Sequence, residues 1–367
     1  MSIKNDTLFN LFVVHSGITE IIADLTVEYL GLNSADTAAL SFRGDFQVRG
    51  IPTLRVADVA KANGARNRWA AARQNVRDCD DAIEQQVQGR HFRLFVPHLA
   101  APPYRYLSAH PLCSEIAYIE EGTTSYFQAP GTGRINPLKP STAYRVIHDL
   151  LLYGPVRRFG IVCLYSEDFY PNWQASSFYF VGACAFPWAR FRFQLNPGSL
   201  VDEWDGPGHI LAVDRLRASG AESPEQQEVP GVPSAPQWAD EGVPVTDYLR
   251  ALDRLLTVLV GKGVDALAFK FHPIEQDAYA DQVRDLLQTR RGVRVTELDR
   301  TFSIERNCRD RHVYSVTSSA SHYANLFGGV GHSFKDFLDP AVRRELRSDT
   351  GPYAPASLVF GREFPPI

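Results

Sequence analysis

The sequence lacks the features that mark several classes of protein. Its five cysteines (Cys79, Cys113, Cys163, Cys184 and Cys308) are odd in number and form no Cys-x-x-Cys pair. This pattern argues against a zinc framework and against a secreted disulfide scaffold. Cys163 and Cys184 stand in apolar runs, and we expect both in a core.

Long apolar runs and an excess of positive charge are also missing. No run approaches the roughly 20 apolar residues of a membrane-spanning helix, and the N-terminus has no pattern typical of a signal peptide. The net charge is −4, whereas a nucleic-acid partner usually needs a basic surface. We therefore expect a cytoplasmic protein without a nucleic-acid partner, which at most rests on the inner face of the membrane.

Length and composition indicate two folded domains. The chain has 367 residues, of which 44% are hydrophobic and 22% are charged, the balance of a soluble globular protein. Short apolar runs alternate with segments of helical spacing, a rhythm that builds parallel sheets covered by helices. Strands are expected at 8–14, 38–42, 91–97, 115–119, 176–185, 210–213, 266–271, 293–297 and 313–316. Helices are expected at 18–30, 80–87, 141–152, 245–259, 276–288 and 320–327.

The pattern predicts an α/β protein of two Rossmann-like lobes that face a cleft. The first domain is expected at 1–205 and the second at 206–345, with a tail at 346–367 that packs back on the first domain. Residues 219–243 are rich in Pro, Gly, Ser, Glu and Gln, and we expect a mobile loop there. Open α/β sheets bind ligands at the carboxyl ends of their strands, so residues at strand ends are the candidates for chemistry.

Three expected strand ends carry residues suited to catalysis. Glu120 and Glu121 precede Gly122, and a carboxylate at such a turn can act as a general base. The second strand end reads Lys270-Phe271-His272-Pro273, in which the imidazole can bind a phosphate and protonate it as it leaves.

Ser318 and Ser319 form the third group. They precede an expected helix, whose N-terminal amide groups and nearby hydroxyls can bind an anion. Each of the three groups also has a plain structural explanation: a solvated acidic turn, a turn histidine and a helix cap.

Taken together and in this order, the three motifs resemble those of bacterial sialyltransferases with the GT-B fold. These are glycosyltransferase families 52, 80 and 38, the last of which includes polysialyltransferases. The resemblance covers most of the chain, and families 52 and 38 fit its length best. The chain departs from it in having Glu-Glu where many members have Asp-Asp.

The resemblance implies a role for each motif residue. Glu121 is then the general base, supported by Glu120 and Gly122, and His272 assists the departure of CMP. The other residues implied in donor binding are Lys270, Pro273, Glu305, Ser318 and Ser319. On the acceptor side, His15, Ser16, Arg43 and His98 lie near expected strand ends and are weaker candidates.

The implied reaction is an inverting transfer of sialic acid, or a related nonulosonic acid, from a CMP donor to a hydroxyl of a glycan. The acceptor would be a surface polysaccharide, a lipooligosaccharide or a glycoprotein glycan, and neither a metal nor another cofactor is required. One alternative is a transferase for another CMP-activated acid such as Kdo, legionaminic or pseudaminic acid. Others are a non-catalytic nucleotide-sugar-binding protein and a UDP-sugar epimerase of similar two-lobed form.

Overall fold

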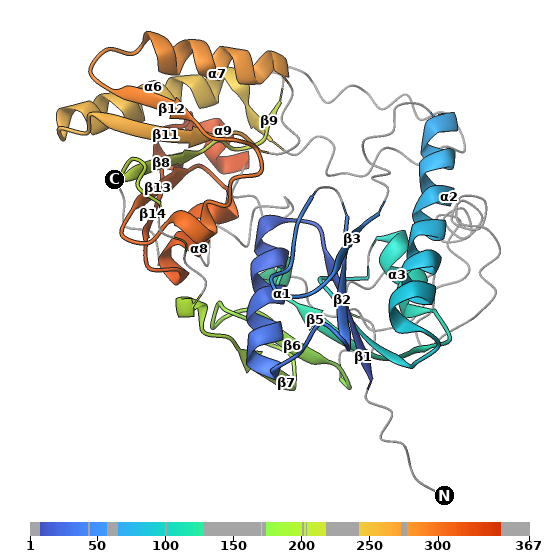
Figure 1. Cartoon of the computed structure of the whole chain (residues 1–367). Coiled ribbons are helices and arrows are strands. Elements are labelled where there is room, and N and C mark those ends of the chain that lie inside the picture. Colours follow the sequence, from blue (N-terminus) through green and yellow to red (C-terminus); the bar gives the residue numbers. More distant parts are fainter. Residues whose placement is uncertain are drawn as a thin grey trace, which may run out of the picture. The chain divides into compact units, whose positions relative to one another are not determined.

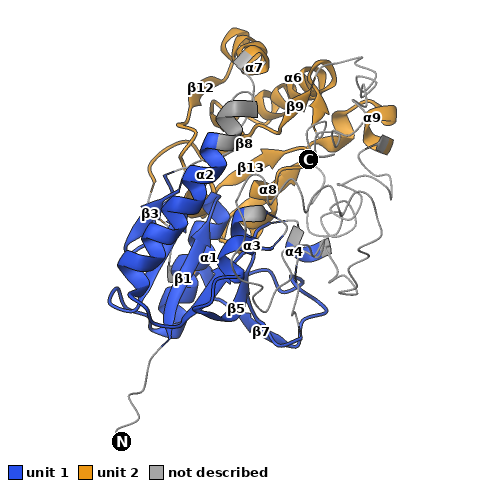
Figure 2. Cartoon of the chain, turned by 90° about the vertical axis from the view of Figure 1, so that its right-hand side faces the viewer, with its two compact units in different colours: residues 1–197 blue, residues 198–367 orange. Residues whose placement is uncertain are grey.

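The computed structural model describes residues 8–42, 45–56, 65–99, 101–122, 124–127, 170, 174–199, 202, 204–217, 242–272 and 277–345. The chain divides into two compact units, residues 1–197 and 198–367 (Figure 2). No described helix is both long enough and apolar enough to cross a bilayer.

Unit 1 is built on a parallel sheet of seven strands with the order β3-β2-β1-β4-β5-β6-β7. Its first six strands follow the 3-2-1-4-5-6 order of doubly wound dinucleotide-binding folds. The strands are β1 (Phe9–Val14), β2 (Thr37–Ser41), β3 (Thr53–Arg55), β4 (Phe92–Val96), β5 (Cys113–Ile119), β6 (Ser177–Phe180) and β7 (Phe191–Gln194).

Helices cover both faces of this sheet. Figure 1 shows α1 on one side, and α2 and α3 on the other. These helices are α1 (Gly17–Leu30), α2 (Ala65–Ala82), which continues into a π-helical turn (Ile83–Val87), and α3 (Pro102–Ser108); a short α4 (Thr124–Phe127) follows β5. All six residues of β1 are buried, as expected for a strand of a parallel sheet covered on both faces.

Unit 2 contains a second parallel sheet, with the order β12-β11-β8-β13-β14. Renumbered within the unit, this order is 3-2-1-4-5, again of the Rossmann kind. The strands are β8 (His209–Ala212), β11 (Ala266–Lys270), β12 (Arg294–Glu297), β13 (His312–Ser315) and β14 (Val330–Ser333); β9 (Leu216–Arg217) and β10 (Val243–Pro244) form a separate parallel pair. The helices are α6 (Val245–Gly261), α7 (Asp277–Thr289), α8 (Ser319–Leu326) and α9 (Pro340–Glu345), and short 3-10 turns occur at Glu305–Asn307 and Lys335–Phe337.

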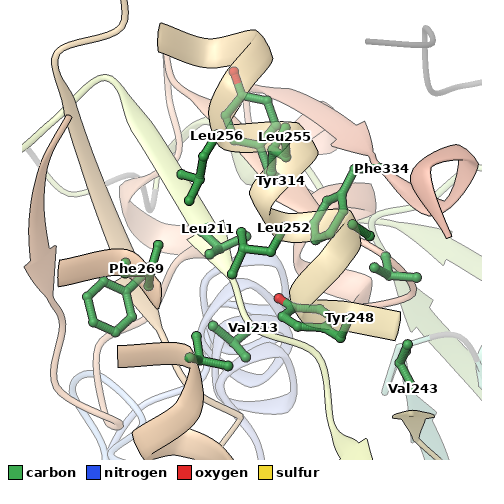
Figure 3. Packing of buried hydrophobic residues seen from close by; sticks show 14 of the residues in the cluster. Leu211, Val213, Val243, Tyr248, Leu252, Leu255, Leu256, Phe269, Tyr314 and Phe334 are labelled. Atoms are coloured by element: carbon green, nitrogen blue, oxygen red, sulfur yellow. The ribbon is translucent and has the colours of Figure 1, made fainter. Parts of the chain in front are cut away.

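The core of unit 2 explains why α6 forms where it does. Leu252, Leu255 and Leu256 recur at helical spacing, and all three are fully buried against side chains of the sheet, among them Leu211 and Phe269 (Figure 3). Burying each such side chain contributes about 1.5–3 kcal/mol. The amphipathic pattern of the sequence therefore places α6 over the sheet.

The predicted fold class is confirmed: the chain is an α/β protein with two parallel, Rossmann-like sheets. The expected strand at 176–185 was too long, because β6 ends at Phe180. The amide groups of Val181 and Gly182 donate instead to the carboxylate of Glu120.

The prediction that Cys184 is a core residue was wrong, since it is exposed. Cys163, the helix at 141–152, nearly all of the loop at 219–243 and the tail at 346–367 lie outside the described residues.

Candidate functional site

In unit 1, strand register places three acid–base side chains at one edge of the sheet. Phe12 of β1 pairs with Phe95 of β4, which in turn pairs with Ala117 of β5. His15 and His98 are each the third residue after an aligned phenylalanine. They and Glu121 therefore follow the carboxyl ends of three adjacent strands, including the β1–β4 pair where the strand order reverses. Open α/β sheets bind ligands at this switch point.

The carboxylate of Glu121 lies between the two imidazoles. Its Oε1 is 2.9 Å from Nε2 of His15, and its Oε2 is 3.2 Å from Nε2 of His98. The side chain of Glu121 is 14% exposed, against 4% for His15 and 10% for His98. Burial alone would raise the pKa of Glu121, but the two imidazoles outweigh burial and hold that pKa well below its usual range. Glu121 is therefore ionised at neutral pH.

Glu120, the other member of the acidic pair, has a structural role. It is fully buried, and its Oε1 accepts a 2.6 Å hydrogen bond from the Tyr126 hydroxyl. Its Oε2 accepts from the amide groups of Val181 and Gly182 at 2.7 and 3.2 Å. A side chain at Gly182 would overlap the Tyr126 hydroxyl, so glycine is required there. Glu120 thus joins the end of β5 to the end of β6, and the two carboxylates do not share one site.

The turn after Glu121 is shaped by its neighbours. The amide group of Glu121 donates to the hydroxyl of Ser125 at 2.9 Å. Gly122 has a φ of 118°, a conformation that L side chains rarely adopt. The backbone of Glu121 is therefore held on both sides, which aims its side chain at the two imidazoles.

Tyr104 is a residue of this cluster that the motifs did not indicate. It lies on α3, is 1% exposed, and its hydroxyl is 2.8 Å from Nδ1 of His15. The sequence offers only a weak signal for it, the Pro-Pro-Tyr start of a helix directly after a candidate strand end. Ser16, a weak acceptor-side candidate, caps α1 by accepting from the amide of Thr19. Arg43 lies outside the described residues.

In unit 2, the register again brings candidate residues to one edge. Leu211 of β8 pairs with Phe269 of β11 and with Tyr314 of β13. Asp214, His272 and Thr317 are each the third residue after an aligned position. All three therefore follow the carboxyl ends of adjacent strands, and β8 and β13 form the switch point of this sheet.

A cationic cluster surrounds His272. Burial and, to a smaller extent, the nearby charges of Arg215 and Lys270 lower the pKa of His272 to about 4. Burial also lowers the pKa of Lys270, while Glu305 and Asp299 act in the opposite direction. Three groups that could meet an anion thus lie close together, with His272 neutral at pH 7. Arg215 was not among the expected residues, although it lies only three residues after the end of β8.

The turn before α8 is held by Asp214, which the sequence analysis also missed. Its Oδ1 accepts from the amides of Thr317 and Ser318 at 2.6 and 2.7 Å and from the Thr317 hydroxyl at 2.9 Å. Its Oδ2 accepts from the amide of Val316 at 2.7 Å. Burial raises the pKa of Asp214 despite these hydrogen bonds. The amides just before α8 are therefore already bound to a carboxylate.

The serine pair begins helix α8. Ser318 is the N-cap residue, and its hydroxyl accepts from the amide of Ala320 at 3.3 Å. Ser319 is the first helical residue, and both serines are partly exposed. Glu305 begins a 3-10 turn and accepts a 3.3 Å hydrogen bond from Ser303. Pro273 lies outside the described residues.

Among the described residues, no group of three or more His, Cys, Asp or Glu side chains could hold a metal ion. An Asp-x-Asp pattern occurs at Asp78 and Asp80. Both residues lie within α2, where they accept hydrogen bonds from Gln74 and Tyr106.

Comparisons with known proteins give structural neighbours only. No protein-family model matches the chain, and no curated protein matches its sequence. Similar solved structures include a sialyltransferase from Photobacterium damsela, with a TM-score of 0.47 and 11% identity, covering 98% of this chain and 81% of the other. Another is the UDP-GlcNAc 2-epimerase from Neisseria meningitidis bound to UDP-GlcNAc, with a TM-score of 0.38 and 11% identity, covering 92% and 86%. The fold class therefore rests on the strand orders of the two units, each of which is a Rossmann-like parallel sheet.

Proposed function

We propose that the chain is an inverting glycosyltransferase that moves sialic acid, or a related nonulosonic acid, from a CMP donor to a hydroxyl of a glycan. One observation carries the proposal: the carboxylate of Glu121 is held between His15 and His98 at the switch point of a Rossmann-like sheet. A buried carboxylate that stays ionised is suited to take a proton from a hydroxyl group. The resemblance of the three motifs to sialyltransferases supports the choice of reaction.

In the proposed reaction, unit 1 supplies the base. The acceptor oxygen bonds to the anomeric carbon of the donor, its proton passes to Glu121, and the bond from that carbon to the phosphate oxygen breaks. The lowered pKa of Glu121 makes the carboxylate available at neutral pH but also a weak base. Proton transfer is therefore expected late, when the acceptor oxygen has begun to bond to the anomeric carbon and its proton has become more acidic.

Unit 2 would hold the donor. Lys270 and Arg215 provide positive charge beside His272, and Ser318 and Ser319 provide hydroxyls for the same phosphate. A phosphate next to His272 favours the charged form of the imidazole, because a nearby opposite charge raises a histidine pKa. His272 would then carry a proton toward the leaving oxygen. Glu305 is the candidate for the ribose hydroxyls, and Pro273 would end the segment that carries His272.

Nucleotide selectivity provides the first test. The melting temperature of the full chain is measured with CMP, UDP, AMP and inorganic phosphate. A ligand at 100 times its dissociation constant adds about 2.7 kcal/mol of stability. We expect CMP to stabilise the protein and UDP to leave it unchanged. Stabilisation by UDP alone would contradict the proposal and favour a UDP-sugar enzyme.

Transfer itself is then measured with CMP-sialic acid and a panel of glycan acceptors. The expected result is acceptor-dependent release of CMP, together with a sialylated product seen by mass spectrometry. Parallel reactions with CMP-Kdo and CMP-legionaminic acid separate the related donors. Binding of CMP without product from any donor would indicate a non-catalytic nucleotide-sugar-binding protein.

A further inference from the structure

We propose that Tyr104 is a positioning residue for Glu121: its hydroxyl fixes His15 so that Nε2–H points at Oε1 of the carboxylate. The inference rests on the proposed role of Glu121 as the base. It adds Tyr104 and the tautomer of His15, neither of which follows from the motifs.

The packing around Tyr104 holds its ring in one place. Its side chain is 1% exposed and makes an edge contact with Phe42, the ring centroids being 5.2 Å apart. Its ring stacks on His15 at 5.8 Å with an angle of 7° between the planes, and lies 5.4 Å from the ring of His98. Tyr104 thus contacts both imidazoles that flank Glu121.

Hydrogen-bond chemistry then selects the tautomer of His15. A neutral imidazole has one N–H donor and one bare nitrogen that accepts. The phenol of Tyr104 is 2.8 Å from Nδ1. When His15 is neutral, we infer that the phenol donates to Nδ1 and that the ring proton lies on Nε2, which is 2.9 Å from Oε1 of Glu121. The reverse tautomer would place a bare nitrogen against an ionised oxygen.

Both oxygens of Glu121 face an imidazole. Oε1 accepts from His15 at 2.9 Å, and the buried Oε2 lies 3.2 Å from Nε2 of His98. Both contacts help to hold the pKa of Glu121 below its usual range. By fixing His15, Tyr104 therefore fixes the orientation of the Glu121 carboxylate at Oε1.

Nitrogen NMR of the histidine rings tests this inference without any substrate. The full chain is labelled with 15N-histidine, and spectra at pH 7 are assigned with a His15→Gln variant. We expect His15 to carry a proton on Nε2 in the wild type, and a population with bare Nε2 to appear in Tyr104→Phe. Tyr106→Phe is the matched control: Tyr106 lies on the same helix but donates to Asp80, and its spectrum should match the wild type. A bare Nε2 in the wild type, or an unchanged spectrum in Tyr104→Phe, would overturn the inference.

Enzyme kinetics provide a second test. Loss of one neutral hydrogen bond corresponds to about a two- to tenfold effect, so Tyr104→Phe should lower kcat by that factor while CMP affinity stays constant. His15→Gln keeps an amide donor for Oε1 and has no tautomer to select. Adding Tyr104→Phe to His15→Gln should therefore cause no further loss. Additive losses would indicate that Tyr104 acts only on folding. If the wild type transfers no sugar, the proposed function fails, while the NMR result still decides the role of Tyr104.

Discussion

Replacing Asp214 with asparagine tests how unit 2 shapes its candidate phosphate site. The carboxylate accepts four hydrogen bonds from residues 316–318, three at Oδ1 and one at Oδ2. In Asp214→Asn, the amide nitrogen takes the place of one oxygen. With the nitrogen at the Oδ2 position, three bonds remain and an N–H group faces the N–H of Val316.

The size of the effect follows from these contacts. A hydrogen bond to a charged group contributes about 1.5–3 kcal/mol, and a buried donor left unpaired costs about 1–3 kcal/mol. Burial raises the pKa of Asp214, because burying its negative charge costs free energy. A neutral asparagine avoids this cost, which offsets part of the free energy lost with the hydrogen bonds. We expect a net destabilisation of about 2–3 kcal/mol. For a unit of this size, that corresponds to roughly 4–12 °C in Tm.

Differential scanning calorimetry of the full chain measures the shift. Asp253→Asn is the matched control, because Asp253 also lies in unit 2 but pairs with Arg290 at a site where its side chain is 47% exposed. Exposed pairs contribute less than about 1 kcal/mol. Equal Tm values for Asp214→Asn and Asp253→Asn would refute the view that Asp214 holds the turn before α8.

Three further outcomes are expected. Glu120→Gln should lower the stability of unit 1 by about 2–4 kcal/mol, because one buried oxygen that accepts amide or phenol donors is lost; an unchanged urea midpoint would argue against its structural role. Burial lowers the pKa of His322 and, with nearby His312, of His332 to about 4, so the unfolded state binds more protons below about pH 6.5. The free energy of unfolding is therefore highest above pH 6.5 and decreases toward pH 4. His332→Gln should make this decrease smaller, as measured by urea titrations at pH 7 and pH 5. CMP should bind more tightly at pH 5 than at pH 7, since His272 gains a proton beside the phosphate; pH-independent affinity in calorimetry would count against that contact.

The sheets could be predicted because their strands are nearly continuous apolar runs. Every residue of β1 is buried, and five of its six residues are apolar, so the strand stands out in the sequence. The strand β3, the helix α3 and the edge strand β7 were missed. The helix expected at 80–87 was far too short, because α2 already begins at Ala65. Its sequence is mostly polar and charged, so it carries too little hydrophobic periodicity for assignment.

The candidate site was only partly visible for a different reason. His15, His98 and Glu121 each follow an apolar strand, so a rule based on strand ends finds them. Their contact depends on the order β1-β4-β5, which no local pattern encodes. Asp214 illustrates the same limit: it bonds to residues 102 to 104 positions away along the chain, so the amides at 316–318 could not be recognised as occupied.

The most direct test of the account is a comparison of Glu121→Gln with the wild type in sialic acid transfer and in CMP binding. A general base contributes roughly 10²–10⁴-fold in rate, and Glu121 belongs to unit 1, whereas the proposed CMP-binding residues belong to unit 2. We expect kcat to fall by that factor while the dissociation constant of CMP stays the same. A variant that keeps more than about a tenth of wild-type turnover, or that loses CMP binding as well, would contradict the assignment of Glu121 as the base.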